Sequence, residues 1–334
     1  MNRNRYRLKF NDLTGCWVPV AEHMRARGKR GRCATLRVLA GAVAAAFSLG
    51  VSANGPLPVA AGTFIAPNSP GMAAAPVVNG STMTITQTTA APVVMQWNSF
   101  SVDQGHAVRF VQPDVTSRAI NVVLPGGPRS DIYGSIQANG QVFLFNQAGV
   151  LFGPNAVVDV GGLVASSLRL NDELINRSLS ALGVTGAALS GDASAGDVMV
   201  QAGARIIAAD NGRIVLAAPR VSNAGTLQAN QGQVLLAAGE KVYLADSLDS
   251  RLRGLLIEVD NGGTVSNEVA GKLVAERGNI TLAGLNVNQL GSARTTTSVT
   301  LNGSIHLNAR DTMVARTVTT ATGRRAGARF FAYG

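Results

Sequence analysis

The carboxylates and histidines of this chain are its first candidates for chemistry. Acid–base catalysis and calcium binding both need carboxylates gathered on one face of the fold. His106 and His306 lie 200 residues apart with no second His or Cys nearby, which argues against a metal site. The chain has no P-loop, no GxGxxG motif and no nucleophile elbow, so we expect no enzyme, no cofactor and no metal. The aspartates of the body are scattered, without a basic partner one coil away: Asp103, Asp114, Asp131, Asp159, Asp210 and Asp260.

The net charge of +10 could indicate a nucleic-acid partner, so its location along the chain matters. Residues 1–53 carry +8 and residues 310–334 carry +4, which leaves about −2 for the body from 54 to 309. A body without a basic surface does not predict a nucleic-acid partner. The most charged stretch of the body is residues 238–254. It is either a surface patch that binds a carbohydrate or a partner, or a solvated loop between coils, and we favour the loop.

The first 53 residues are organised like a secretory signal. A basic region precedes the short apolar run VLAGAVAAAFSLGVSA (38–53), which ends on the small residues that signal peptidase accepts. We therefore predict export by the Sec machinery and cleavage between Ala53 and Asn54, with an uncleaved membrane anchor as the alternative. Both cysteines, Cys16 and Cys33, lie in this leader, so the mature chain is expected to form no disulfide.

The body repeats a short phrase in which a glycine-containing turn precedes an alternating apolar strand. A strand this short cannot bury its apolar face alone, whereas a stack of coils can. The spacing of 20 residues between Gly212 and Gly232 suits one coil per repeat. We expect Asn and Gly at the corners to take the left-handed conformations that the bends need. The copies are NGQVFLF (139–145), NGRIVLAA (211–218), QGQVLLAAG (231–239), RGNITLAG (277–284) and NGSIHLNA (302–309).

These repeats predict an all-β solenoid. Their shared orientation favours a parallel β-helix over an antiparallel sandwich, which Asn-Gly hairpins would also allow. Residues 54–80, rich in Pro, Gly and Ala, are expected to cap the N-terminal end of the stack. Helix is expected only in the leader and in a short turn around residues 171–176. The domains are therefore a signal region (1–53), a β-helix (54–309) and an irregular basic tail (310–334).

Several segments, in order, resemble the N-terminal secretion domain of the filamentous haemagglutinin family, the exoproteins of two-partner secretion. They are NSFSVDQGHAVRFVQP (98–113), AINVVL (119–124) and SDIYGSIQANGQVFLFNQAGVLFGPNAVVDVGGLVASSL (130–168). The likeness has its core at 98–168 and continues to about residue 310. The leader is similar to the extended signal-peptide region of very large type V secreted proteins of Gram-negative bacteria.

The resemblance implies a right-handed parallel β-helix that periplasmic domains of a dedicated outer-membrane transporter recognise. The family motif Asn-Pro-Asn-Gly falls on residues 146–149, where the first and last residues match and the middle two depart. The proline that would pre-set the turn is therefore missing. The residues that the resemblance assigns to the secretion motif are Asn146, Gln147, Ala148, Gly149, Val150, Phe152 and Gly153. Further positions that match the family are Asn121, Gly161 and Gly162.

The functional prediction is a non-enzymatic exoprotein, secreted or held at the cell surface of a Gram-negative bacterium after passage through the periplasm. In long relatives this implies an adhesin or haemagglutinin with a host-cell or carbohydrate receptor. We interpret this chain as such a protein or as its N-terminal part, a truncated or isolated secretion domain. Two alternatives stay open: a stand-alone surface adhesin, and a β-helix enzyme that acts on polysaccharides.

Overall fold

The computed structural model describes residues 6–11, 16–21, 55–181, 184–246, 255–296 and 304–315. The chain divides into two units, residues 1–46 and 47–334, and each is described by itself. The predicted cleavage point between Ala53 and Asn54 lies outside the described residues. Within the described part, no helix is long and apolar enough to cross a membrane.

The described residues of the leader form an antiparallel hairpin of β1 (Tyr6–Asn11) and β2 (Cys16–Ala21), in which Phe10 lies opposite Trp17. We expected helix in the leader, and for these two segments that expectation is wrong. In YRLKFN, apolar or aromatic residues at 6, 8 and 10 alternate with basic or polar residues at 7, 9 and 11. A period of two residues fits a strand and not a helix.

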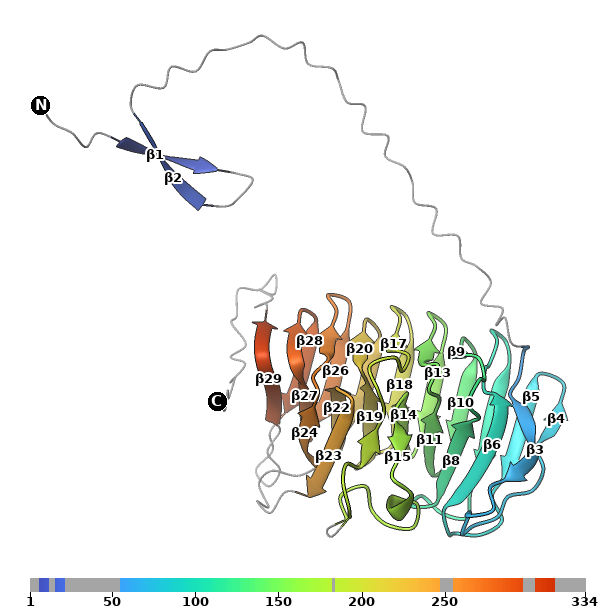
Figure 1. Cartoon of the computed structure of the whole chain (residues 1–334). Coiled ribbons are helices and arrows are strands. Elements are labelled where there is room, and N and C mark those ends of the chain that lie inside the picture. Colours follow the sequence, from blue (N-terminus) through green and yellow to red (C-terminus); the bar gives the residue numbers. More distant parts are fainter. Residues whose placement is uncertain are drawn as a thin grey trace, which may run out of the picture. The chain divides into compact units, whose positions relative to one another are not determined.

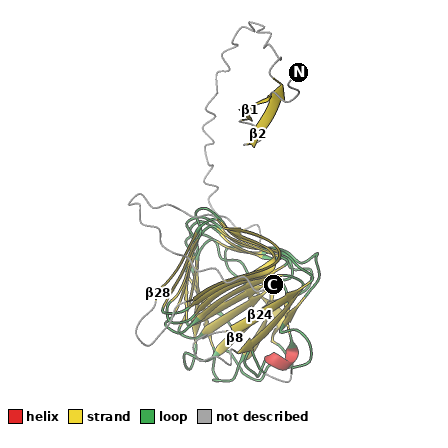
Figure 2. Ribbon diagram, turned by 90° about the vertical axis from the view of Figure 1, so that its left-hand side faces the viewer, coloured by secondary structure: helices red, strands yellow, loops and turns green. Residues whose placement is uncertain are grey.

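The second unit is a stack of coils, and a coil places short strands on three faces (Figures 1 and 2). The first face is a nine-stranded sheet: β4 (Val77–Asn79), β5 (Thr82–Thr86), β7 (Ala107–Val111), β10 (Ser135–Ala138), β13 (Val157–Val160), β18 (Arg205–Ala208), β21 (Thr226–Ala229), β26 (Lys272–Glu276) and β28 (Ser292–Thr296).

The second and third faces form one continuous 14-stranded sheet, because β27 (Asn279–Gln289) runs through the corner between them. The second face also contains β3 (Val59–Ile65), β6 (Val93–Ser99), β8 (Arg118–Val123), β11 (Gln141–Phe145), β14 (Gly162–Ser166), β19 (Arg213–Ala218) and β22 (Gln233–Ala238). β29 (Ser304–Ala315) pairs with both halves of β27 and therefore continues, like β27, from the second face onto the third. The third face contains β9 (Ser130–Ile132), β12 (Val150–Phe152), β17 (Val198–Val200), β20 (Arg220–Asn223) and β25 (Thr264–Asn267).

Equivalent residues of successive coils stand beside one another in parallel register. On the second face the column runs from Val142 to Leu163, Ile214, Val234 and Ile280. Parallel pairing of short strands, coil after coil, confirms the predicted parallel β-helix and excludes the antiparallel sandwich as the architecture of the stack. The repeats specify this register because a slip of one residue would turn every apolar side chain outward.

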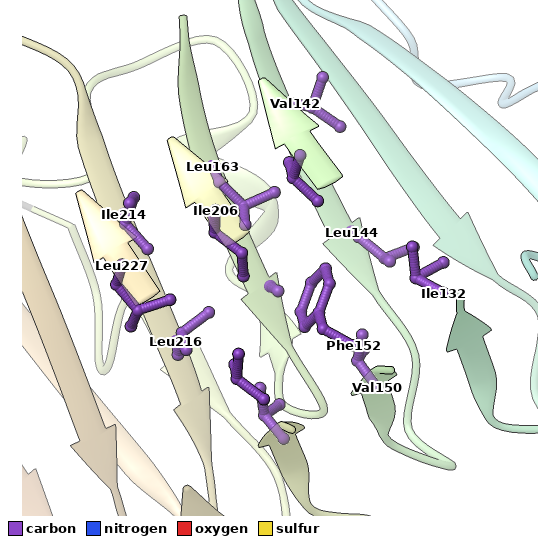
Figure 3. Close-up of a cluster of buried hydrophobic side chains, with 14 of the residues drawn as sticks. Ile132, Val142, Leu144, Val150, Phe152, Leu163, Ile206, Ile214, Leu216 and Leu227 are labelled. Carbon is purple, nitrogen blue, oxygen red and sulfur yellow. The ribbon is translucent and has the colours of Figure 1, made fainter. Parts of the chain in front are cut away.

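The space between the three faces is filled by apolar side chains that point inward (Figure 3). Phe152 on the third face and Leu144 on the second are each at most 1% exposed. Burial of this kind stabilises by about 25 cal/mol per Å² of apolar surface removed from water. Each coil alone could bury little, so the stability of a coil depends on its neighbours.

Glycines occupy one corner of successive coils: Gly140, Gly161, Gly212, Gly232 and Gly278. We expected Asn and Gly at the corners to supply left-handed conformations, which is confirmed for Asn211 and wrong for these five glycines. At Gly212, Gly232 and Gly278 the positive φ falls on the preceding residue, at +65° for Asn211, +55° for Gln231 and +56° for Arg277. Each glycine is instead needed for close approach, since a Cβ on Gly212 would meet the carbonyl oxygen of Gly161, and one on Gly232 would meet that of Gly212.

The N-terminal end of the stack is closed by strands that run against the direction of the coils. β3 pairs antiparallel with β6 on the second face, and β4 pairs antiparallel with β5 on the first. The Phe64 ring packs edge-on against Trp97, with centroids 5.2 Å apart. The predicted cap over residues 54–80 is therefore present, and it covers what would otherwise be bare sheet edges.

A small antiparallel sheet covers part of the outer surface of the second face. It consists of β15 (Arg169–Leu170), β16 (Leu189–Ser190), β23 (Lys241–Asp246) and β24 (Leu255–Asp260), and the 3₁₀ turn η1 (Asp172–Leu174) lies beside it. Under this cover is a second apolar cluster that includes Phe143, Val215 and the fully buried Val242. We favoured a solvated loop for residues 238–254, but this stretch contributes the packed strand β23.

The strand pattern also continues beyond the predicted boundary at residue 309. β29 runs to Ala315 and pairs in parallel with the second half of β27, with Thr312 opposite Asn286. Residues 310–315 were expected to belong to an irregular tail. The exposed edge of β27 offers backbone partners to these residues regardless of the weak apolar pattern of their side chains.

Candidate functional site

Residues 146–149 form a tight turn at the corner between β11 and β12. The Gly149 N–H donates to the carbonyl oxygen of Asn146 at 2.8 Å, which closes the turn. The Ala148 N–H donates to Asn146 Oδ1 at 2.9 Å, so the asparagine side chain braces the same bend. Neither Gln147 nor Ala148 has a positive φ. This geometry is that of a type I turn, in which Asn is favoured at the first position and Gly at the fourth.

The Asn146 side chain also anchors the turn to the preceding coil. Its Nδ2 donates to the carbonyl oxygen of Pro128 at 2.8 Å and to Ser130 Oγ at 2.9 Å. Asn146 is 3% exposed, and Ser130 is fully buried. The bond to Ser130 is buried and the bonds to Pro128 and Ala148 are partly buried, so loss of a partner in any of them would cost free energy.

Gly149 packs against the following coil. Its φ is +100°, and a Cβ there would lie 2.6 Å from the carbonyl oxygen of Asp197. On the other side of this contact, a Cβ on Gly196 would meet the carbonyl oxygen of Ala148. The Gly196 N–H donates to the carbonyl oxygen of Gln147 at 2.8 Å. The turn is thus clamped between the segment around residue 130 and the loop around residue 196.

Gln147 and Ala148, in contrast, are exposed at the tip of the turn. A hollow of about 350 Å³ on one side is lined by apolar side chains of the second face and the η1 region, among them Ile120, Phe145 and Ile175. A hollow of about 270 Å³ on the other side is formed with residues 124–127 and 191–195. Asn146 and Gln147 line both. The turn therefore stands as a ridge between two concave surfaces.

The other residues assigned to the motif serve the interior. Val150 and Phe152 are fully buried on the third face and belong to the interior core. Gly153 lies under the ring of Tyr133, which a Cβ would strike. These residues position the turn from within, and none of the three presents a side chain to a partner.

Asn121 lies far inside the stack, fully buried on β8. Its Oδ1 accepts a hydrogen bond from Trp97 Nε1 at 3.0 Å, and its Nδ2 donates to the carbonyl oxygens of Ala119 and Phe143, each at 3.1 Å. Every polar atom of the side chain is satisfied, which allows an asparagine to remain in an apolar core. The structure therefore gives Asn121 a role in the core and no exposed surface for a partner.

Gly161 and Gly162 lie at the opposite end of the β14 strand from the turn, and they differ from each other. A Cβ on Gly161 would lie 2.7 Å from the carbonyl oxygen of Gly140, whereas the nearest atom to a Cβ on Gly162 would be 3.4 Å away. The structure therefore does not bring these two glycines together with residues 146–149.

This difference predicts unequal effects of alanine at the two positions. Gly161→Ala should lower the free energy of unfolding by about 1–3 kcal/mol, because the added methyl group overpacks a backbone contact. Gly162→Ala should change it by less than about 0.5 kcal/mol. Chemical denaturation of the two variants checks this, and equal effects would contradict the assigned role of Gly161.

The carboxylates stay dispersed in the folded chain. Asp131 pairs with Arg129 at 2.6 Å, and Asp260 lies 4.0 Å from Arg310 at the other end of the stack. In the described part of the chain, no three His, Cys, Asp or Glu side chains gather into a group that could hold a metal ion. His106 and His306 are both half-buried, and burial lowers the pKa of His306.

Sequence reasoning missed the partners of the turn. The loop of residues 191–197 flanks the turn, yet the segment that leads to it departs from the repeats and resembles none of the matched stretches. Only the cluster of small and turn-forming residues in SGDASAGD (190–197) indicated a loop there.

Comparison with known families and structures gives a consistent result. The family described as "TPS secretion domain" matches residues 65–254, more than half of the chain. The family described as "Extended Signal Peptide of Type V secretion system" matches residues 1–51. The solved HMW1 secretion domain from Haemophilus influenzae superposes with a TM-score of 0.61 over 73% of this chain and 62% of that one, at 24% identity, which shows a shared fold.

Two curated relatives are heme/hemopexin-binding proteins of Haemophilus influenzae. One, from strain Rd, is 35% identical over 161 residues, which are 48% of this chain and 17% of the relative. The other is 37% identical over 98 residues, which are 27% of this chain and 10% of the relative. The matched region therefore spans less than a fifth of the length of either relative.

Proposed function

The chain belongs to the TPS secretion domain family, and from this premise we propose that the turn at residues 146–149, with its two flanking hollows, is the surface that the transporter's periplasmic domains recognise. Membership of this family gives the general function of the chain directly. The chain is the secretion domain of an exoprotein of two-partner secretion, exported from a Gram-negative cell through the periplasm. Its partners in export are the Sec machinery and an outer-membrane transporter.

The pattern of burial in the turn supports this proposal. Asn146 and Gly149, which keep the family residues, are buried and hold the bend, whereas Gln147 and Ala148, which depart from the family residues, are exposed. The bend forms without the proline, because the Asn146 side chain braces it and Gly149 supplies the positive φ. Buried residues that hold a turn with an exposed tip leave the side chains of the tip, Gln147 and Ala148, accessible to a partner.

The hollows beside the turn supply the concave part of such a surface. Ile120 and Phe145 give the larger hollow an apolar floor, and Arg169 and Asp172 stand among its lining residues. An apolar floor bordered by charged groups suits an inserted side chain of a partner, since apolar burial gives affinity and the charges fix orientation. The observation that carries the proposal is the position of Gln147 on the wall of both hollows.

The test is to change the exposed tip residues, Gln147 and Ala148, and to leave the buried frame residues, Asn146 and Gly149, as they are. A double variant, Gln147→Arg with Ala148→Arg, should weaken binding of the full chain to the purified periplasmic domains of its transporter by at least about tenfold. The reason is that a long charged side chain at 147 would border both hollows and one at 148 the smaller hollow. Secretion into the medium should fall in parallel. The free energy of unfolding should change by less than about 0.5 kcal/mol, since both positions are exposed.

A second turn of the same form provides the control. Residues 268–271 close with the Gly271 N–H donating to the carbonyl oxygen of Glu268 at 2.7 Å, and Val269 at its tip is 72% exposed. The double variant Val269→Arg with Ala270→Arg adds the same charge at a distant coil, and it should bind and be secreted like the unchanged chain. Normal binding by the variant at 147 and 148, or equal loss by both variants, would overturn the proposal.

The role of the exported protein after secretion is a separate matter. The curated relatives bind heme or hemopexin according to their names, but the match covers 17% or less of either. We therefore assign to this chain the export step that its family shares. An adhesin or haemagglutinin role stays a prediction, which cell-binding assays with the secreted chain test.

A further inference from the structure

We propose that a cavity on the outer surface of the second face, between Arg118 and Arg213, binds a small organic anion through its carboxylate or phosphate group. The cavity has a volume of about 350 Å³ and lies at the opposite end of the strands from the turn at 146–149. It is not part of the recognition surface described above, and the inference does not depend on the export proposal.

The register of the coils builds the cavity. Arg118, Gln141, Gly162 and Arg213 occupy equivalent positions of successive strands, in that order. The two arginine Cα atoms are thus three strand spacings apart, about 14 Å at the usual 4.7–4.9 Å per strand. Gly162 has no side chain, so it leaves a gap in the column beside Arg213, and both arginines are among the residues that line the cavity.

The charge of the cavity is uncompensated among the described residues. None of its lining residues is acidic. The two nearest carboxylates in the sequence are engaged elsewhere: Asp114 accepts hydrogen bonds from Thr116 and Ser117 within its own turn, and Asp210 accepts one from Gln231. Arg213 is half-buried and makes no ion pair or side-chain hydrogen bond with any described residue. Two cations that line one cavity without an acidic lining residue create a site that attracts an anion.

The Arg118 guanidinium is held in place by only one of its nitrogen atoms, Nη1. Its Nη1 donates to the carbonyl oxygen of Arg177 at 2.7 Å and to that of Leu174 at 3.4 Å, which fixes the guanidinium against the η1 loop. Burial lowers the pKa of Arg118, which reports a desolvated cation without a carboxylate partner. Its Nε and Nη2 make no hydrogen bond with a described residue, and an arginine carries five N–H donors. A planar carboxylate or a phosphate is the natural acceptor for this fork.

The remaining lining limits the size and polarity of the ligand. Ser178, Gln141 and Asn211 offer neutral polar groups, while Phe143 and Leu179 form an apolar wall. A volume near the lower end of the range for ligand sites suits a short organic acid or phosphate ester and not an extended chain. The site therefore combines two cations for the acidic group with a small apolar surface for the carbon skeleton.

The test is titration calorimetry of the full-length chain with succinate in one arm and methyl phosphate in the other. The arms distinguish a carboxylate ligand from a phosphate ligand. Saturable binding of either probe is expected, and Arg213→Gln should raise its dissociation constant at least about tenfold, because a charge-assisted hydrogen bond is lost. Gly162→Val should have a similar effect, because its side chain would fill the gap. A Cβ at position 162 has no backbone atom as close as the one that a Cβ on Gly161 would meet.

The matched control is Arg205→Gln, which removes the same charge from an exposed position of β18 on the first face. It should leave the dissociation constant of either probe unchanged. Absence of saturable binding in both arms would overturn the proposal. So would binding that Arg213→Gln and Gly162→Val leave intact, or that Arg205→Gln weakens equally, since the anion would then sit elsewhere or respond only to net charge.

Discussion

Gly232→Ala is expected to be among the most damaging single substitutions in this chain, with a loss of more than about 3 kcal/mol of unfolding free energy. Overpacking of a core usually costs 1–3 kcal/mol, because side chains can adjust. At Gly232 the added methyl group would meet the carbonyl oxygen of Gly212, which is backbone held in the ladder between β19 and β22. The two coils would have to separate, and the columns on both sides of the corner would lose register.

Chemical denaturation followed by circular dichroism measures this loss. Gly62→Ala is the matched control, because Gly62 lies in the edge strand β3 and a Cβ there would have no atom within 4 Å. The control should be neutral to within about 0.5 kcal/mol. A Gly232 variant as stable as the unchanged chain would contradict the role of close approach that the structure gives to this corner.

Asn146→Ala is expected to lower the free energy of unfolding by about 2–4 kcal/mol, because buried polar groups lose their partners. The carbonyl oxygen of Pro128 and the hydroxyl of Ser130 would lose the Nδ2 donor, and the Ala148 N–H would lose Oδ1. Binding to the transporter's periplasmic domains should weaken as well, since the tip residues depend on this frame.

Asn155→Ala provides the comparison for Asn146. Asn155 is exposed in the next turn along the chain, and its side chain makes no hydrogen bond with a described residue. Its replacement should change neither stability nor transporter binding. If Asn146→Ala weakened binding without any loss of stability, Asn146 would contact the transporter directly and the assignment of a structural role would be wrong.

Much of the architecture was predictable because the repeats state it locally. The phrases at 139–145, 211–218 and 231–239 each combine a turn with a strand of fixed period, and they became β11, β19 and β22 of one face. The short turn predicted around 171–176 is η1. The covering sheet was not predictable, because β15, β16, β23 and β24 come from separate excursions whose pairing has no sequence repeat.

In the candidate site, too, some features could be predicted from the sequence and others could not. Asn146 and Gly149 could be singled out from the sequence, since a type I turn prefers these residue types at these positions. The sequence could not separate frame from tip, because burial depends on what lies on either side of the corner. The segment around residue 130 and the loop around residue 196 supply these neighbours, 16 and 50 residues away.

By itself, the sequence determined the export signal, the coil repeat and the residues of the turn, because each is a pattern within a few tens of residues. Only the tertiary structure decided that Gly161 and Gly232 lie against a carbonyl group of the neighbouring coil, and that Arg118 and Arg213 line the same cavity. The physical reason is the stacking of coils. Stacking brings residues that are one or more repeats apart to the distance of a strand pair. Which residues meet depends on the length of each loop between coils, and no local sequence pattern specifies that length.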